Sequence, residues 1–347
     1  MKEAVAASAP MRSRHLELTL RSFRSAELRC RRRPSTRVLL LDLVSRVAPL
    51  LLGYSLMFMP SPIDYLGVAL FAVATVSLLG SWFHDGVHGN IPWPKLAARL
   101  VERLGAGPLG ISPLWWQYKH VRMHHRYVSN PEFDPDIQFG LLARVSVVQN
   151  WSIWHRSQHF HMWFLMPLAT LNMLKPNEVW YSRRYRKYKE FESAPSAWVF
   201  LVDKYITFAV VWLPLFVFKP LSNAILDWTL FMLMTGTLAS LITQVQHNTE
   251  LAIGDEEFST LYPLCEQLVR TTDVGVSKGI WWWLCGGVNF HIMHHVAPTL
   301  SFRELPEVTE RLKLCLLDAG VELPVHQNIF VALVSHARLL RKLARRP

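Results

Sequence analysis

Histidine carries the clearest chemical pattern in this chain. Fifteen histidines are present, and eight of them fall in three short clusters, HDGVH at 84–88, HVRMHH at 120–125 and HIMHH at 291–295. On a helix, residues three and four positions apart lie on one face, so each cluster aims two or three imidazoles at a common point. Imidazole is a ligand for zinc and for redox-active transition metals. The clusters therefore predict a metal site.

The spacing separates strong signals from weak ones. At this histidine frequency, each three-histidine pattern is expected by chance about 0.03 times per chain, and the two-histidine pattern about once in two chains. The first cluster alone means little, whereas the set of three in one chain is a specific signal. The histidines expected to be ordinary surface or core residues are His15, His155, His159, His161, His326 and His336.

Long apolar segments must position these clusters. Of the 347 residues, 51% are hydrophobic, and several uninterrupted apolar runs approach the roughly 20 residues that a membrane-spanning helix needs. Four spans are predicted, at about 40–60, 63–83, 198–218 and 224–245. The connections within each pair hold only a turn, so the spans form two hairpins. The predicted fold is an all-α integral membrane protein with a helical cap on one side.

This topology brings the clusters to one face of the membrane. The first cluster begins one residue after the second span, and His247 follows the fourth span by two residues. The apolar stretch Phe160–Leu174 reaches only about 22 Å as a helix, so it is expected to be re-entrant or interfacial. A helix over 96–104 is expected along the interface, and Trp281–Trp283 at headgroup level.

The distribution of charge predicts which side carries the cap. Of the 37 Lys and Arg residues, 34 lie in 1–37, 84–195 and 248–347, which this topology places together. Under the positive-inside rule that side is the cytoplasm, and a bacterial cytoplasmic membrane is the expected location. The net charge of +11 is read as topology and attraction to anionic membrane lipids. Nucleic-acid binding is not expected, because no recognised nucleic-acid module accompanies the charge.

Three parts are expected along the chain. Residues 1–37 are interpreted as a basic cytoplasmic tail, with a transit peptide as the alternative, and no cleaved secretory signal is expected. Residues 38–320 would form the membrane domain, and 321–347 an amphipathic basic tail. The four cysteines show no CxxC spacing, which excludes a zinc ribbon and a self-contained ferredoxin and fits a reducing compartment.

The chemistry of the donors narrows the metal. Nine imidazoles without an obvious carboxylate ligand are too many for one zinc and suit a redox-active metal such as iron, so two irons are the natural count. The predicted ligands are His84, His88, His120, His124, His125, His247, His291, His294 and His295. A metal-bound imidazole needs a partner for its second nitrogen. The candidates to support the ligands are Asp85, Asp134, Asp136 and Asn248.

These motifs resemble the membrane fatty acid desaturases, whose pattern is HxxxH or HxxxxH, then HxxHH or HxxxHH, then (H/Q)xxHH. The clusters occur here in the same order, and the surrounding WWQYKHVRMHHRYVSNPEFDPDI and GGVNFHIMHHVAPTLS are similar to that family as well. The resemblance runs from about Leu66 to Leu312. It implies a four-helix membrane stalk under a cytosolic cap, two irons held by the histidines, and His247 as the ligand that follows the fourth span.

The resemblance also implies a reaction and its partners. Two ferrous ions would reduce dioxygen, the co-substrate, and the resulting oxidant would abstract hydrogen from an unactivated methylene of a fatty acyl chain. Two abstractions from adjacent carbons give an alkene. The acyl carrier could be a phospholipid, acyl-CoA or acyl carrier protein. No haem-binding HPGG segment is present, so a separate donor is expected, such as ferredoxin or a haem-b cytochrome with its reductase.

Two other functions are compatible with part of this pattern. An acyl or hydrocarbon hydroxylase, ketolase or acetylenase would use the same di-iron site, although the NYxEHYG-like element of alkane-type hydroxylases is missing. A non-catalytic membrane protein that binds metal or haem would place histidines within facing spans or polar residues along a crossing path. The predicted spans contain no histidine, which favours an enzyme with its site at one mouth of the bundle.

Overall fold

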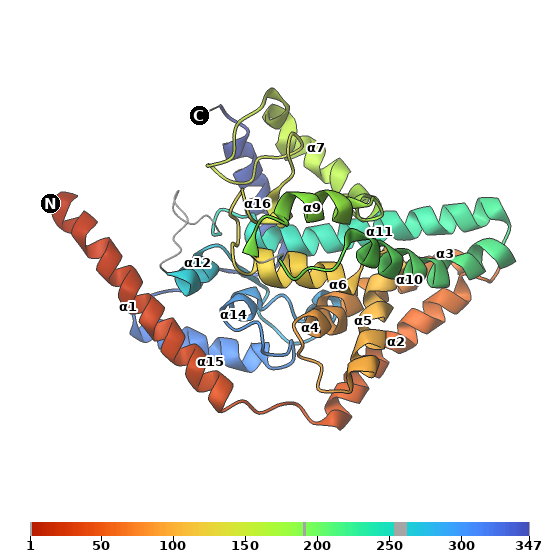
Figure 1. Cartoon of the computed structure of the whole chain (residues 1–347), viewed down its shortest axis with the longest axis horizontal. Coiled ribbons are helices and arrows are strands. Elements are labelled where there is room, and N and C mark those ends of the chain that lie inside the picture. The colour runs from red at the N-terminus through yellow and green to blue at the C-terminus, as the bar shows by residue number, and fades with distance from the viewer. Residues whose placement is uncertain (1, 190–191, 253–261, 347) are drawn as a thin grey trace.

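Four long apolar helices form the membrane part of the fold. The computed structural model describes residues 2–189, 192–252 and 262–346, with side chains from Arg14 onward. Within these residues, four helices are long and apolar enough to cross a membrane, Thr36–Leu56 (α2), Ile63–Val87, Ala197–Phe218 (α10) and Leu221–His247 (α11). The predicted number and pairing of spans are confirmed. In Figure 1 the two hairpins extend together toward one end of the molecule.

The second span changes its helical type before it ends. Its residues form α3 (Ile63–Leu78), then the π-helical turn η1 (Leu79–Phe83), then α4 (His84–Val87). The helices α2 and α3 pack with their backbones close together: a Cβ on Gly53 would lie 2.5 Å from the amide nitrogen of Phe71. Small residues permit this close approach between membrane helices.

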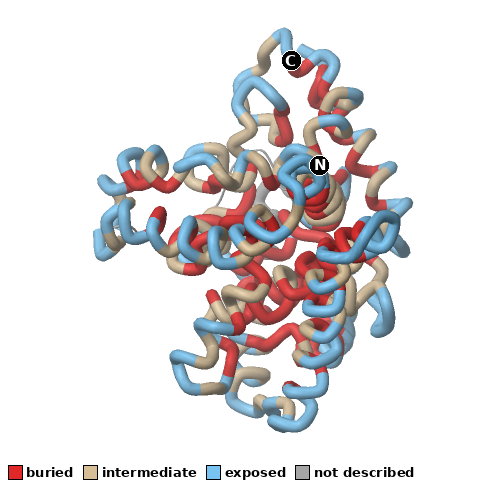
Figure 2. The backbone as a smooth tube through the Cα atoms, turned by 90° about the vertical axis from the view of Figure 1, so that its right-hand side faces the viewer, coloured by how far each residue is buried: buried red, intermediate tan, exposed pale blue. Residues whose placement is uncertain are grey.

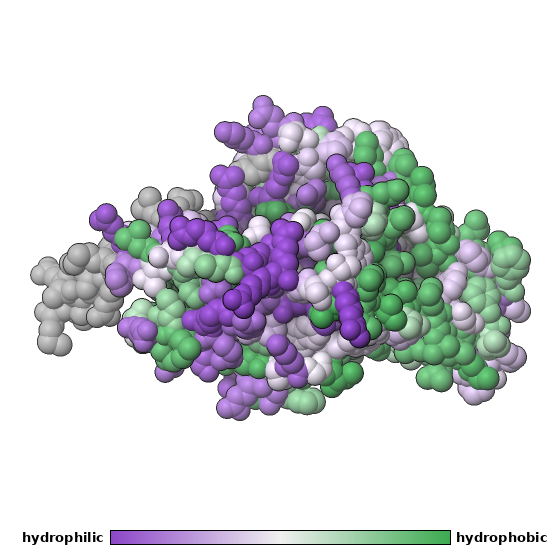
Figure 3. Space-filling model, turned by 90° about the horizontal axis from the view of Figure 1, so that it is seen from below, coloured by the Kyte–Doolittle hydropathy of each residue, from purple (hydrophilic) through white to green (hydrophobic). Residues whose placement is uncertain are grey.

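The outer surface of the bundle is apolar. Large side chains such as Leu66, Val210 and Phe218 are more than half exposed, as expected for a surface that faces lipid. Figure 3 shows apolar side chains over the part of the molecule where the spans lie, and hydrophilic side chains gathered over the middle of that face. Figure 2 shows the buried segments in the middle of the molecule, surrounded by exposed ones.

The described residues of the segment between the hairpins form short helices. They are α5 (Lys95–Ala106), η2 (Gly107–Leu109), α6 (Pro113–Trp116), η3 (Gln117–His124), η4 (Pro135–Ile137), η5 (Ile153–Ser157), α7 (Gln158–Leu165), η6 (Met166–Leu168), α8 (Ala169–Met173) and α9 (Asn177–Tyr185). The apolar stretch Phe160–Leu174 is divided among α7, η6 and α8, and forms no fifth span. It lies against α11 instead, where the Thr170 hydroxyl donates to the Met232 carbonyl at 2.6 Å.

The remainder of the chain completes the cap. Its elements are α12 (Pro263–Val269), β1 (Asp273–Val274), α13 (Ile280–Cys285), α14 (His291–Val296), α15 (Leu305–Asp318), β2 (Val325–His326) and α16 (Ile329–Leu343). The two strands pair in parallel. α13, which carries the three tryptophans, packs on α3, and α16 packs on α11 and α7. The C-terminal segment is thus integrated into the fold as well as amphipathic.

The basic N-terminal segment differs from a solvated tail. It forms a long helix, α1 (Lys2–Arg29), which contacts α12 and α15 and lies along the edge of the cap in Figure 1. Glu17 and Leu20 are buried there. The Glu17 carboxylate accepts the backbone N–H groups of Leu264 at 2.9 Å and Cys265 at 3.1 Å. These N–H groups lie in the first turn of α12, where a helix has no carbonyl of its own to accept them, so α1 stabilises that helix end.

Candidate metal centre

The second histidine cluster lies on a π-helix rather than an α-helix. In η3, the backbone N–H of His125 donates to the carbonyl of His120 at 2.9 Å, five residues earlier. In an α-helix, neighbours such as His124 and His125 would point about 100° apart. A wider π turn takes in more than four residues, so His120, His124 and His125 all face the same region. The first cluster likewise follows the π turn η1.

The third cluster forms the short, fully buried helix α14. Asp273 on β1 holds the start of this helix, because its carboxylate accepts the backbone N–H of Ile292 at 2.8 Å. Burial raises the pKa of Asp273 to about 7. His247 joins the cluster from the end of α11, with its Nε2 at 2.7 Å from Nε2 of His291.

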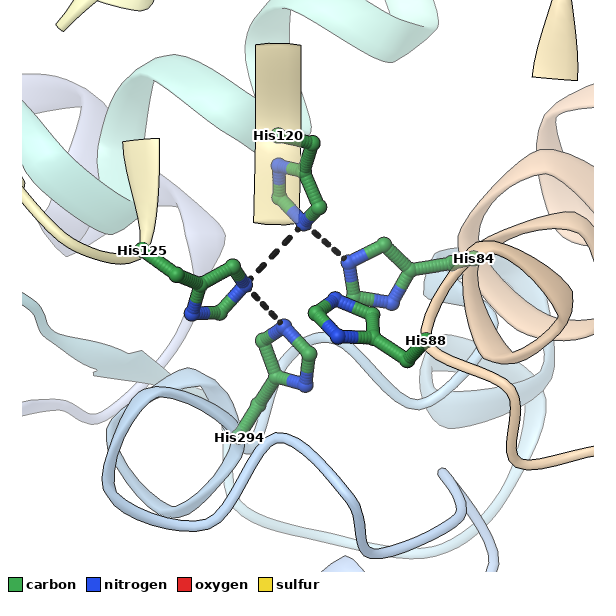
Figure 4. A group of neighbouring side chains, drawn as sticks. All are labelled: His84, His88, His120, His125 and His294. Atoms are coloured by element: carbon green, nitrogen blue, oxygen red, sulfur yellow. Dashed lines mark hydrogen bonds between the residues drawn. The ribbon is translucent and has the colours of Figure 1, made fainter. Parts of the chain in front are cut away.

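The nine histidines converge as two groups. The first group is His84, His88, His120, His125 and His294, and the second is His124, His247, His291 and His295. Within each group, one ring nitrogen from every histidine lies within 4.8 Å of the others. Figure 4 shows the first group, with rings from three separate parts of the chain pointing toward one another. The two adjacent pairs, His124–His125 and His294–His295, are each divided between the groups.

The spacing of the nitrogens fits metal ligands. In the first group, Nε2 of His120 lies 2.8 Å from that of His84 and 3.1 Å from that of His125, which lies 2.9 Å from that of His294. A metal with bonds of about 2.1 Å to nitrogen would hold adjacent ligands about 3.0 Å apart in octahedral geometry and about 3.4 Å apart in tetrahedral geometry. The observed distances match the octahedral value. Since neighbouring lone pairs repel, a cation between them would stabilise the arrangement.

Comparison with known proteins agrees with this site. The model of the fatty acid desaturase family matches residues 60–324. The chain belongs to the fatty acid desaturase family. It is therefore a membrane oxidoreductase that acts with dioxygen, as the resemblance of its motifs predicted.

Three curated relatives show how far the similarity extends. The chain is 23% identical over 283 residues to an sn-1 linoleoyl-lipid 6-desaturase of Arthrospira platensis, and the aligned region covers 76% of this chain and 73% of the relative. It is 22% identical over 297 residues to a protein of the same name from Synechocystis, covering 82% and 81%. An acyl-lipid (8-3)-desaturase of Mortierella alpina is 24% identical over 304 residues, covering 80% and 64%.

Outer hydrogen bonds in this desaturase fix three of the four rings of the second group. Nδ1 of His124 lies 3.0 Å from the Asp134 carboxylate, that of His247 lies 3.1 Å from the Arg270 carbonyl, and that of His295 lies 2.6 Å from the Gln267 amide oxygen. Each acceptor requires a proton on Nδ1, which leaves the lone pair of Nε2 for a metal. Asp134 was predicted from sequence, whereas Gln267 and Arg270 were not, because no histidine lies near them in the chain.

The other residues predicted to support the ligands have their main partners elsewhere. Asp136 forms a short ion pair with Lys119, and its carboxylate is 3.5 Å from Nδ1 of His124. The Asp85 carboxylate accepts the backbone N–H of Phe302 at 3.1 Å, so it holds the segment after the third cluster.

Asn248 also forms its hydrogen bonds away from the predicted ligands. Its side-chain NH₂ donates to the side chain of Gln244, and its backbone carbonyl accepts from the ring of His336. Neither Asp85 nor Asn248 has a hydrogen bond to a ligand ring among the described residues, because each has partners elsewhere.

Electrostatics keep most of the rings neutral, which is the form that binds metal. Burial lowers the pKa well below the ordinary value near 6.5 for six of them, His88, His120, His125, His291, His294 and His295. His124 is different. Burial again lowers its pKa, but the adjacent Asp134 carboxylate outweighs that effect and leaves the pKa raised. The predicted non-ligand histidines lie in neither metal group.

Proposed function

We propose that the two histidine groups each bind one iron ion, and that the enzyme introduces a C=C bond into fatty acyl chains of membrane lipids. The observation that carries the proposal is the convergence of nine imidazoles on two points where two of the spans end. Bound iron would supply the redox chemistry by which dioxygen removes hydrogen from two adjacent methylenes. The protein's own part is to keep most of the rings neutral by burying them and to orient them, as Asp134, Arg270 and Gln267 do for three rings of the second group.

Lipid-linked chains are the proposed substrate. The relatives named above are acyl-lipid or linoleoyl-lipid desaturases, and a site at the end of two spans lies next to the acyl chains of the bilayer. The test is to incubate membranes that contain the enzyme with isotope-labelled acyl chains on phospholipid, coenzyme A or acyl carrier protein. New double bonds, detected by mass spectrometry, are expected first in the phospholipid. Product formed only from coenzyme A or carrier protein would contradict the lipid substrate.

A separate electron donor is also proposed, either ferredoxin or a haem-b cytochrome with its reductase. Dioxygen reduced to two waters takes up four electrons, and forming the alkene provides only two, so a donor must provide the rest. Exposed basic residues at and after the end of α9 are candidates to dock an acidic donor. They are Arg183, Arg184, Arg186 and Lys187.

Alanine at these four positions tests the docking surface. We expect the variant to need more donor for half-maximal rate and to lose part of the salt dependence of that rate. Alanine at Arg338, Arg341 and Lys342, which are exposed on α16, is the control. Equal donor dependence in wild type and the four-residue variant would reject this surface.

The site is proposed to face the cytoplasm of a bacterial cell. The support is the count of basic residues, 34 of 37 on the side of the cap, together with the positive-inside rule. A reporter enzyme fused after residue 347 should be active only if it is one that functions in the cytoplasm. Activity of a reporter that works only outside the cytoplasm would contradict this orientation.

A further inference from the structure

Gln267 touches two histidines that come from different clusters. It lies on α12, outside every histidine motif, and is 4% exposed. Its side-chain oxygen accepts from Nδ1 of His295 at 2.6 Å. Its side-chain nitrogen donates to the backbone carbonyl of His125 at 2.6 Å. Both polar atoms of the amide are therefore used, each on a different predicted ligand.

The two histidines belong to different metal groups. His125 is in the first group and His295 in the second. Their rings stack with centroids 4.2 Å apart and planes inclined by 28°. One glutamine thus holds a stacked pair of rings that joins the two groups, by fixing the ring of His295 directly and the backbone of His125.

The chemistry of an amide suits this position. The carbonyl of His125 accepts only, so the NH₂ of Gln267 must face it and the oxygen must face His295. That oxygen requires the proton of His295 to be on Nδ1, leaving Nε2 as the metal-binding atom. A glutamate could accept from His295 but could not donate to His125. A methionine of similar length could form neither normal hydrogen bond.

The surroundings keep Gln267 in place. Glu17 of α1 accepts two N–H groups at the start of α12, and Leu20 packs in one buried cluster with Leu268. The Thr271 hydroxyl donates to the backbone carbonyl of Gln267 at 2.6 Å. The helix that carries the glutamine is thus anchored on α1, which holds the amide near the histidines.

We propose that Gln267 is a positioning residue for both metal sites, which orients His295 in one and His125 in the other. The proposal rests on the proposed binding of two irons. Losing an outer hydrogen bond of this type typically weakens metal binding about 10–100-fold. Because one ligand of each group is affected, the environment of both irons should change when the amide is removed.

The test uses the full-length protein, purified in detergent and loaded with ⁵⁷Fe. Q267M, Q267E and wild type are compared by Mössbauer spectroscopy and by the chelator concentration that removes iron. The control is Q158M, because Gln158 is also fully buried and bonds to the backbone of Arg144 and Leu340, away from the metal groups. Q267E covers the case in which Q267M folds poorly, since it keeps an acceptor for His295.

For Q267M we expect altered Mössbauer signals of both irons and iron removal at chelator concentrations about 10–100-fold lower. Q267E should alter both signals and lose iron less readily than Q267M, and Q158M should match wild type. Unchanged signals in Q267M and Q267E, a change at one iron only, or equal iron loss in Q158M and Q267M would overturn the positioning role. Absence of iron from the wild-type protein would instead overturn the proposed function.

Discussion

Among substitutions that leave all nine histidines in place, Asp134→Asn is predicted to perturb the second metal group most strongly. The buried carboxylate of Asp134 accepts from the ring of His124 at 3.0 Å and from the backbone N–H groups of Ser129 at 2.7 Å and Asp136 at 2.9 Å. An asparagine keeps one oxygen and presents an NH₂ group to at least one of these donors. The lost charge-assisted hydrogen bond corresponds to about 1.5–3 kcal/mol. At 25 °C this equals about 10–150-fold in affinity, in line with the usual effect of such partners.

The assay is iron retention against a chelator, with the Mössbauer spectrum of each variant. D134N should release one iron about 10–100-fold more readily, while the signal of the other iron changes little, because His124 is not among the five histidines of the first group. Asp136→Asn is the matched control, since this carboxylate is farther from the same ring nitrogen, at 3.5 Å, and pairs with Lys119. Two irons retained as tightly in D134N as in wild type, or an equal loss in D136N, would refute the reasoning.

Three further predictions concern the ligands, the packing and the pH dependence. H247A removes one of four imidazoles from the second group, so the iron content should fall from about two to about one per chain, whereas H326A, outside both groups, should keep two. G236A should destabilise the fold by about 1–3 kcal/mol or more, because the new Cβ would lie 2.2 Å from the Pro167 carbonyl. The control G107A should not be destabilised, because its Cβ would meet atoms no closer than 3.6 Å. Equal melting temperatures of the two variants would contradict this prediction. The metal-free protein should lose thermal stability as the pH falls below about 6.5, because six buried histidines with lowered pKa values stay neutral in the folded state and bind protons on unfolding. Groups with raised pKa values, such as His124 and Asp273, oppose this trend. A melting temperature that rises on acidification would contradict the prediction.

The sequence was sufficient for the parts of the fold that have a local signal. Apolar runs predicted the four spans. Phe160–Leu174 was predicted to be too short for a fifth, and the described part of the chain contains four helices long enough to span. Eight candidate ligands could be predicted because the histidines of each cluster are spaced to share one helix face. His247 could be predicted because it closely follows the fourth span. The structure brings all nine into the two groups.

Other features depend on contacts between distant parts of the chain. Gln267 and Arg270 reach His295 and His247 only after α12 folds beside α14 and α11. The π-helical form of η3 depends on a hydrogen bond five residues back, so α-helical spacing could not reveal that adjacent histidines serve different groups. The burial of α1 against α12 was also unpredictable, because its basic composition resembles that of a solvated tail and Glu17 acts 247 residues away.

Two metal ions held by histidine alone are central to the proposed function. The direct measurement is elemental analysis of the purified full-length protein together with its optical spectrum. The account predicts about two irons per chain, no haem absorption band, and loss of one iron without the other when a ligand of a single group is replaced. One zinc per chain, or a haem spectrum, would contradict it.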